Sequence, residues 1–238
     1  MFEREIVVSR SRAKELIQNG AVSLDGKIVR KPSYEIPDDF EPTKITIDEA
    51  QNKYVSRGGY KLEGAITHFH LDCKGKVSLD VGASTGGFTD CLLAYNARKV
   101  YAVDSGTAQL SPKLLLDERV VSIENYNARF MKKEDFADKI DLVVIDVSFI
   151  SQTLILPQIA SLLEKEGELV SLIKPQFEVG RDCVGKKGVV KDEKARQAAI
   201  KKVCDFAHEL NFELMGIMKS PIEGGDGNIE YLAYFKKN

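Results

Sequence analysis

The chain has 238 residues, of which 43% are hydrophobic and 29% charged, and this composition can fill a sizeable core, which excludes a mainly disordered protein. With 34 basic and 36 acidic residues the net charge is only −2, so a polyanion would have to dock on local basic stretches. No apolar run approaches the ~18 residues of a membrane-spanning helix, and the start MFEREIVVSR lacks a secretory signal, so we expect a cytoplasmic protein.

The cysteines and histidines form no recognisable ligand set. The cysteines are Cys73, Cys91, Cys183 and Cys204. They lack the Cys-x-x-Cys spacing of zinc sites, so we expect reduced thiols, no disulfide framework and no metal. The histidines show no ligand spacing either and are expected to pack in the fold or lie on its surface.

The first segment predicts a short helix followed by a hairpin. Ser9 or Ser11 can cap the helix, and Asn19-Gly20 ends it. Val22 to Val29 then alternates about Asp25-Gly26, a pair that is typical of two-residue hairpin turns. One more strand is expected at Lys44 to Ile47, and a polar linker at Asp48 to Lys53. The first domain boundary is therefore expected near residue 50.

Beyond residue 50, short β-rich runs alternate with helical stretches. Strands are expected at Val77 to Val81, Val100 to Val103, Val120 to Ile123, Leu142 to Ile145 and Leu169 to Ile173. Helices are expected at Gly87 to Tyr95, Gln152 to Leu163 and Glu193 to Leu210. This alternation predicts an α/β fold with a parallel sheet, which binds ligands at the carboxyl ends of its strands. Phe212 to Met218 and Ile229 to Tyr234 predict a terminal hairpin on the sheet edge.

The segment LDVGASTGGFTD combines a strand ending at Val81, a glycine-rich turn and a helix start. Glycines let the backbone approach a ligand, and the helix start leaves amide N–H groups free. Asp104 ends the next strand and could accept hydrogen bonds from both ribose hydroxyls of a nucleoside cofactor. Ser84 breaks the Gly-x-Gly-x-x-Gly fingerprint, which disfavours NAD and leaves S-adenosylmethionine as the better match. A purely structural turn is the alternative.

Two ionisable residues also follow apolar strands. Asp146 closes the strand in LVVIDVSF and Lys174 closes the next in LVSLIKPQF, so both belong at the carboxyl edge of the expected sheet. There they could face the reactive end of a cofactor, with a structural ion pair as the alternative. Phe149 and Phe177 could stack on a base, although core packing is the ordinary role of such residues.

The chain resembles the TlyA family, whose members are named both hemolysins and ribosomal RNA methyltransferases. The stretches that carry the resemblance are SRSRAKELIQNGAVSLDGK, YVSRGGYKLEGA, LDVGASTGGFTD, VIDVSFIS, LIKPQFEVG and SPIEGGDGNIEYL. The family combines an alpha-L (S4-like) RNA-binding motif with an FtsJ-like methyltransferase domain. The resemblance therefore implies a Rossmann-like S-adenosylmethionine-dependent methyltransferase sheet with a small N-terminal α+β RNA-binding domain.

FtsJ-like 2′-O-methyltransferases use a Lys-Asp-Lys-Glu tetrad, which this sequence matches at Lys61, Asp146, Lys174 and Glu230. The match implies that Lys174 orients a ribose 2′-hydroxyl and stabilises the developing alkoxide, or takes its proton. Asp146 and Glu230 would hold Lys174, and Lys61 would help to place the ribose. The family pattern also implies cofactor contacts from Gly82, Ala83, Ser84, Thr85, Gly86, Gly87, Phe88, Asp104, Asn127, Ala128 and Arg129.

Basic residues of the N-terminal module are implied to bind RNA phosphates, with an ordinary solvated face as the alternative. They are Arg10, Arg12, Lys14, Lys27, Arg30 and Lys31, joined by Arg57 in the linker. In the family this module opens with another short helix, whereas MFEREIVV precedes the Ser-Arg segment here. We expect residues 1–50 to form an S4-like domain lacking that helix, 51–60 a linker and 61–238 the methyltransferase domain. The stretch GRDCVGKKGVVKD could close over RNA or cofactor, or be a mobile surface loop.

The resemblance implies a 2′-O-methyltransferase that acts on a cytidine of 16S or 23S ribosomal RNA, with ribosomal RNA or subunits as partners. An RNA-binding assembly factor with an inactive methyltransferase domain is the second reading, and the retained tetrad argues against it. A membrane-lytic hemolysin is the third, but no membrane-seeking amphipathic segment stands out.

Overall fold

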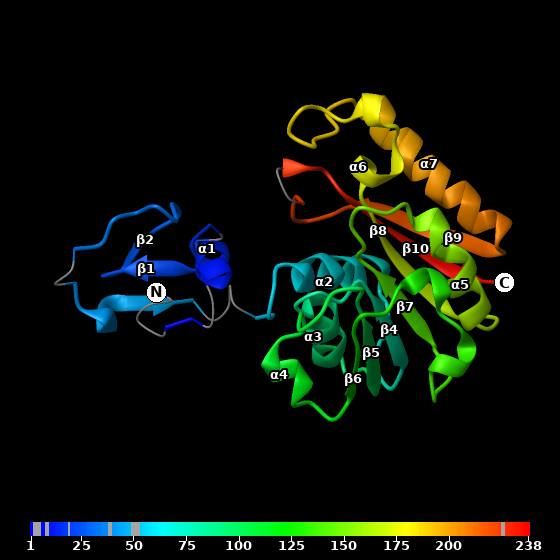
Figure 1. The fold of residues 1–238 in the computed structure, drawn as a ribbon, viewed down its shortest axis with the longest axis horizontal. Helices are drawn as coiled ribbons and strands as arrows, with labels where there is room; N and C mark the ends of the chain where they lie inside the picture. Colours follow the sequence, from blue (N-terminus) through cyan, green and yellow to red (C-terminus); the bar gives the residue numbers. More distant parts are fainter. Residues whose placement is uncertain (2–5, 8–9, 19, 38–39, 49–52, 225–226) are drawn as a thin grey trace. The chain divides into compact units, whose positions relative to one another are not determined.

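The computed structural model describes residues 1, 6–7, 10–18, 20–37, 40–48, 53–224 and 227–238. The chain divides into two compact units, Met1–Ser56 and Arg57–Asn238 (Figure 1). Several expectations fall outside the described residues: Ser9 as a helix cap, Asn19 as a helix end, most of the missing-helix segment, and the linker at 51–52.

The first unit is a small antiparallel sheet with one α-helix. Its elements are α1 (Arg10–Gln18), β1 (Val22–Leu24), β2 (Lys27–Ile28), the 3-10 helix η1 (Pro42–Lys44) and β3 (Ile45–Ile47). β1 pairs with both other strands, which gives the order β2-β1-β3. Asp25 and Gly26 have φ values of 50° and 77°, as a two-residue hairpin turn requires. Leu16 of α1 packs on Val22 and Ile45 in a core that belongs to this unit.

The second unit is built on a seven-stranded sheet. Its strands are β4 (Val77–Val81), β5 (Lys99–Val103), β6 (Val120–Ile123), β7 (Leu142–Ile145), β8 (Glu168–Ile173), β9 (Phe212–Lys219) and β10 (Tyr231–Lys237). The order is β6-β5-β4-β7-β8-β10-β9, in which β4 to β8 are parallel and β10 is antiparallel to both neighbours. The predicted parallel sheet and terminal edge hairpin are confirmed.

Helices cover both faces of this sheet (Figure 1). The α-helices are α2 (Gly58–Phe69), α3 (Gly87–Ala94), α4 (Pro112–Leu115), α5 (Leu156–Leu162), α6 (Pro175–Glu178) and α7 (Glu193–Glu209). The 3-10 helices are η3 (Ala128–Phe130), η4 (Lys133–Asp135), η5 (Gln152–Leu154) and η6 (Arg181–Cys183). α5 and α7 share a core with Val77, Leu79 and Val81 of β4. α2 and α3 contact each other and pack on the opposite face of the sheet, because successive side chains of a strand point to opposite faces.

Two helical segments differ from the sequence-based expectation. α2 is absent from the predicted elements and begins at Gly58, inside the stretch expected as a linker. Glycine in its first turn disfavours a helix, and burial of residues such as Leu62 offsets that cost. The helix expected from Gln152 to Leu163 is divided into η5 and α5, because Ile155 caps a new helix whose first turn contains Pro157.

Candidate active site

Three of the tetrad residues meet at one edge of the sheet. Asp146 directly follows β7 and Lys174 directly follows β8, so both lie at the carboxyl ends of parallel strands. Glu230 directly precedes β10, which runs in the opposite direction, and Tyr231 pairs with Ile173. The start of β10 therefore brings Glu230 to the same edge, although it comes from the end of the chain.

Lys174 is held by the loop that follows β7. Its Nζ lies 2.5 Å from Asp146 Oδ1 and donates a hydrogen bond of 2.9 Å to Ser148 Oγ. Within the described residues the buried Asp146 Oδ1 has no aligned hydrogen bond, so its contact with Lys174 is an ion pair. Lys174 is only 9% exposed, and a buried ammonium group is stabilised when it has such partners. Sequence reasoning missed Ser148 as a partner of Lys174. The feature that could have indicated it is its position two residues after Asp146, in the same loop.

Lys61 of α2 forms a second ion pair at this edge. Its Nζ donates to Glu230 Oε2 over 2.6 Å, and both side chains are buried. Gly224 makes room for this carboxylate, because a Cβ at that position would overlap Glu230 Oε1. The sequence-based hypothesis had both Asp146 and Glu230 holding Lys174. In the structure Asp146 pairs with Lys174, whereas Glu230 pairs with Lys61. Three buried charges and the partly buried Asp146 form two neutral pairs, in which each charge is stabilised by its own counterion.

The glycine-rich turn after β4 approaches the backbone at Asp146. Gly82 has a φ of 86°, and a Cβ there would lie 2.5 Å from the Asp146 carbonyl oxygen. Both the positive φ and the close approach require glycine. The turn is therefore packed directly against the segment that carries the Lys174 partner.

Asp104, at the end of β5, organises the same turn. Its Oδ2 accepts a hydrogen bond of 2.8 Å from the Ser84 N–H, and its Oδ1 accepts one of 2.7 Å from the Gly106 N–H. A carboxylate oxygen can accept two hydrogen bonds, so with respect to the described residues each oxygen keeps a free acceptor position. Asp104 can therefore still bind two hydroxyl groups of a ligand.

A cavity of about 400 Å³ lies along this edge. Its lining includes five of the residues implied as cofactor contacts: Gly82, Ser84, Asp104, Asn127 and Ala128. The other six do not line it: Ala83, Thr85, Gly86, Gly87, Phe88 and Arg129. Phe88 is instead buried in α3. The tetrad residue Asp146 also lines the cavity, which joins the cofactor-sized space to the ion pair with Lys174.

Glu124 shapes a loop that borders the cavity and was also missed by sequence reasoning. Its carboxylate accepts backbone hydrogen bonds of 2.9 Å from Gln109 and 3.2 Å from Leu110, and these bonds lower the pKa of Glu124. Gln109 lines the cavity. The available signal was an acidic residue directly after β6, in the same position relative to its strand as Asp104 has after β5.

Three residues implied in RNA binding come together in the first unit. Arg10, Lys14 and Lys31 border a cavity of about 310 Å³ with an apolar lining. Lys27 lies on β2, away from that lining, and is exposed. Arg30 is also exposed, and its guanidinium group lies against the backbone at Gly20. The two remaining residues are Arg12, placed by its backbone on α1, and Arg57, which caps α2.

Comparison with known proteins identifies the family. Residues 54–237 match the FtsJ-like methyltransferase family, and residues 1–39 match the S4 domain. The 16S/23S rRNA (cytidine-2′-O)-methyltransferase TlyA of Mycobacterium tuberculosis is 40% identical over 236 residues, which cover 99% of this chain and 87% of that protein. This chain belongs to the TlyA family of FtsJ-like methyltransferases.

Other relatives agree with this assignment. Hemolysin A of Brachyspira hyodysenteriae is 45% identical over 229 residues, covering 95% of this chain and 93% of that protein. A solved structure from Streptococcus thermophilus with a hemolysin designation has a TM-score of 0.81 at 42% identity, covering 98% of this chain and 84% of that one. An S-adenosylmethionine dependent methyltransferase from Mesorhizobium loti shares the fold, with a TM-score of 0.56 at 10% identity over 74% of this chain and 98% of that one.

The hemolysin name raises the question of membrane segments. Across the part of the chain that the structure describes, none of the helices combines the length and the apolar character needed to cross a bilayer.

Proposed function

We propose that this protein transfers a methyl group from S-adenosylmethionine to the 2′-hydroxyl of a cytidine in ribosomal RNA, in the cytoplasm. The observation that carries the proposal is the meeting of Lys174 and Asp146 at the edge of a cavity that Asp104 also lines. Two relatives support the substrate. TlyA of Mycobacterium tuberculosis is named for cytidine-2′-O methylation of 16S/23S rRNA, and TlyA of Campylobacter jejuni for the same reaction on 23S rRNA.

The cavity suits S-adenosylmethionine in its size and in its polar groups. Its volume of about 400 Å³ lies in the range of cofactor sites. The free acceptor positions of Asp104 match a pair of ribose hydroxyls, and Gly82 lines the cavity without adding a side chain to it. Asn127 and Ala128 line the part that we assign to the adenine ring. When bound, the cofactor supplies an electrophilic methyl group on a sulfonium.

The tetrad residues then act on the RNA hydroxyl. Lys174 orients the 2′-oxygen and stabilises the negative charge that develops on it as its proton passes to solvent water. The new C–O bond would form as the bond between the methyl group and the sulfonium sulfur breaks. Asp146 and Ser148 keep the Lys174 ammonium group in place. The buried pair of Lys61 and Glu230 lies at the same edge of the sheet, and we assign it to the placement of the ribose. Positioning of this kind can remove ~7 kcal/mol or more from the barrier.

An exposed aromatic ring at the cavity supports a nucleic-acid substrate. Phe149 lines the cavity, is 91% exposed and has a φ of 64°, so it does not take the core position that is ordinary for phenylalanine. A bulky residue in the left-handed region is strained and persists where its surroundings hold it. Its ring centroid lies 5.1 Å from that of Phe177. Exposed aromatic rings stack on unpaired RNA bases, which fits a flipped cytidine.

The test uses Lys174→Ala and, as a matched control, Lys201→Ala, which removes an exposed lysine of α7. Both proteins are incubated with methyl-labelled S-adenosylmethionine and with ribosomal subunits that lack the modification. We expect label on a ribose with the wild type and the control, and a loss of at least about 100-fold with Lys174→Ala at unchanged cofactor affinity. Full activity of Lys174→Ala would refute the assignment.

A further inference from the structure

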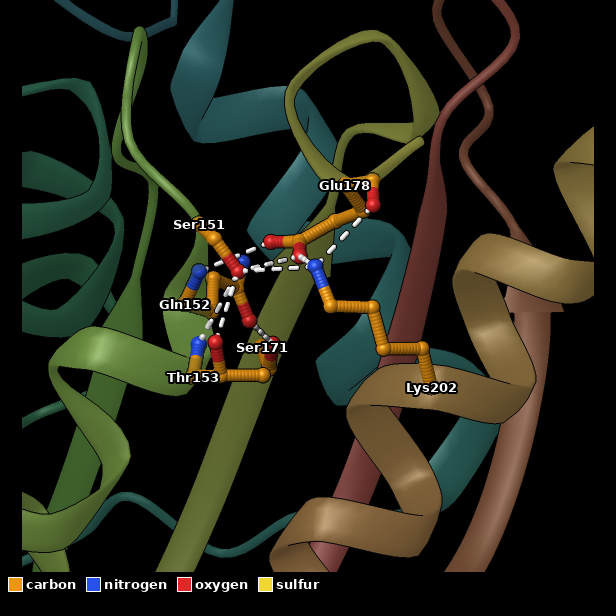
Figure 2. Close-up of polar contacts among 6 residues, drawn as sticks. All are labelled: Ser151, Gln152, Thr153, Ser171, Glu178 and Lys202. Atoms are coloured by element: carbon orange, nitrogen blue, oxygen red, sulfur yellow. Dashed lines mark hydrogen bonds and ion pairs between the residues drawn. The ribbon is translucent and has the colours of Figure 1, made fainter. Parts of the chain in front are cut away.

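A buried polar network lies next to the tetrad, and the proposed function does not use it (Figure 2). At its centre is Glu178, whose side chain is 1% exposed. Its Oε2 accepts a hydrogen bond of 2.6 Å from Ser151 Oγ, and its Oε1 accepts one of 2.7 Å from the Gln152 N–H. Lys202 of α7 donates to Glu178 Oε2 over 3.1 Å and to the Glu178 backbone oxygen over 3.0 Å.

The network is also anchored to the sheet. Gln152 Nε2 donates a hydrogen bond of 2.7 Å to the Leu172 carbonyl oxygen, and Ser171 Oγ donates to Gln152 Oε1. Gln152 and Ser171 are both buried. Figure 2 shows the side chains of η5, α6, α7 and β8 converging on this point. A buried carboxylate with so many donors holds its neighbours in one geometry, because each unsatisfied group would carry a large desolvation cost.

The segments joined by Glu178 are the two that carry the reaction centre. Glu178 ends α6, the single turn that starts directly after Lys174. Ser151 caps η5 at the end of the loop that starts with Asp146 and contains Ser148. Glu178 therefore sets how far the backbone after β8 stands from the backbone after β7. Neither Glu178 nor Lys202 lines the cavity, so the network acts on the chemistry through these two segments.

We propose that Glu178 is a positioning residue for methyl transfer, which fixes the Lys174 segment against the Asp146 and Ser148 segment with the help of Lys202. The proposal rests on the proposed function. A displacement of about 1 Å at a reacting group can cost 100-fold in rate, so loss of this carboxylate acts on turnover and leaves cofactor binding alone.

The experiment compares the wild type with Glu178→Gln, which keeps the size of the side chain and removes its charge. We expect kcat to fall by about 10-fold to 100-fold, while KM and Kd for S-adenosylmethionine stay within about threefold. Activity is measured at a temperature where the variant is fully folded, because a purely structural loss would then disappear. Lys202→Arg keeps the charge and is expected to restore most of the activity that Lys202→Met loses.

A double substitution and a matched control separate the network from general effects. In the Glu178→Gln background, Lys202→Met is expected to cost little more, because the two groups act on one another. The control is Lys201→Met with Asp205→Asn, which removes an exposed ion pair of the same helix. We expect its kcat to equal that of the wild type.

Amide hydrogen exchange tests the positioning without any need for activity. In Glu178→Gln we expect the amides of residues 147–153 to exchange at least tenfold faster, and those of β4 and β5 to be unchanged. If the wild type methylates no RNA but residues 147–153 still exchange faster in Glu178→Gln, the proposed function is refuted and the positioning of this segment by Glu178 stands. Unchanged exchange and unchanged kcat would overturn the proposal. If Glu178→Gln does not fold, Ser151→Ala, which removes one bond of the network, replaces it.

Discussion

Asp80 is a fully buried carboxylate in β4, two residues before Gly82. Its Oδ2 accepts a hydrogen bond of 2.7 Å from Thr89 Oγ1, and within the described residues its Oδ1 has no hydrogen-bond partner. Burial raises the pKa of Asp80 to about 7, the Thr89 hydrogen bond opposes this shift, and the charges of Asp146 and Asp104 add to it. The strand that leads into the glycine-rich turn therefore contains a carboxyl group whose pKa lies near neutral pH in the folded protein.

This residue makes the stability of the cofactor-free protein depend on pH. In the unfolded chain Asp80 titrates near its ordinary value of about 3.9, so between there and about 7 the folded state binds more protons. The free energy of unfolding then falls as the pH rises through this window, by at most about 1.4 kcal/mol per pH unit. Asp80→Asn removes the titration. Urea unfolding from pH 5 to 8 should show its stability rising relative to the wild type, and parallel curves would contradict this.

The turn between η6 and α7 carries two lysines and is held in place by hydrogen bonds from a distant residue. Asn228 donates from Nδ2 to the Gly188 carbonyl oxygen over 2.9 Å and accepts at Oδ1 from the Val190 N–H over 3.2 Å. Asn228 is buried and lies two residues before Glu230. The turn, with its exposed Lys186 and Lys187, is thus attached to the segment that carries a tetrad residue.

This attachment predicts a role for the turn in holding RNA. Substituting Lys186→Gln and Lys187→Gln together should raise KM for RNA about tenfold near 0.1 M salt, because each lost phosphate contact weakens binding a few-fold. kcat and the affinity for S-adenosylmethionine should not change. The control is Lys74→Gln with Lys165→Gln, an equal loss of charge from exposed lysines at the amino edge of the sheet. Equal effects of the two pairs would show that only total charge matters.

The sequence predicted the strands better than it predicted the contacts between distant elements. β7 was expected at Leu142 to Ile145 and has those bounds, because a strand buried on both faces is a continuous apolar run. α2 escaped prediction because its first turn contains glycines, and its stability comes from packing on residues far along the chain. The pairing of Lys61 with Glu230 spans 169 positions, so no local pattern could indicate it.

At the scale of the whole molecule, the chain consists of two compact units, each with its own hydrophobic core. The unit Met1–Ser56 has its own core around Leu16 and Val22 and carries the basic residues that border its cavity. All the residues that line the proposed cofactor cavity belong to the unit Arg57–Asn238. Affinity for RNA phosphates and affinity for S-adenosylmethionine should therefore be separable by substitution.

The substitution that tests this separation is the triple change Arg10→Gln, Lys14→Gln and Lys31→Gln, which leaves the apolar core of the first unit intact. We expect the Kd for a labelled fragment of 23S ribosomal RNA to rise about 30-fold near 0.1 M salt. The slope of log K against log salt concentration should fall by about 2 to 3, since up to three phosphate contacts are lost. Calorimetry should give an unchanged Kd for S-adenosylmethionine. A parallel loss of cofactor affinity would show that the two units are coupled, and an unchanged RNA slope would place the phosphate contacts elsewhere on the chain.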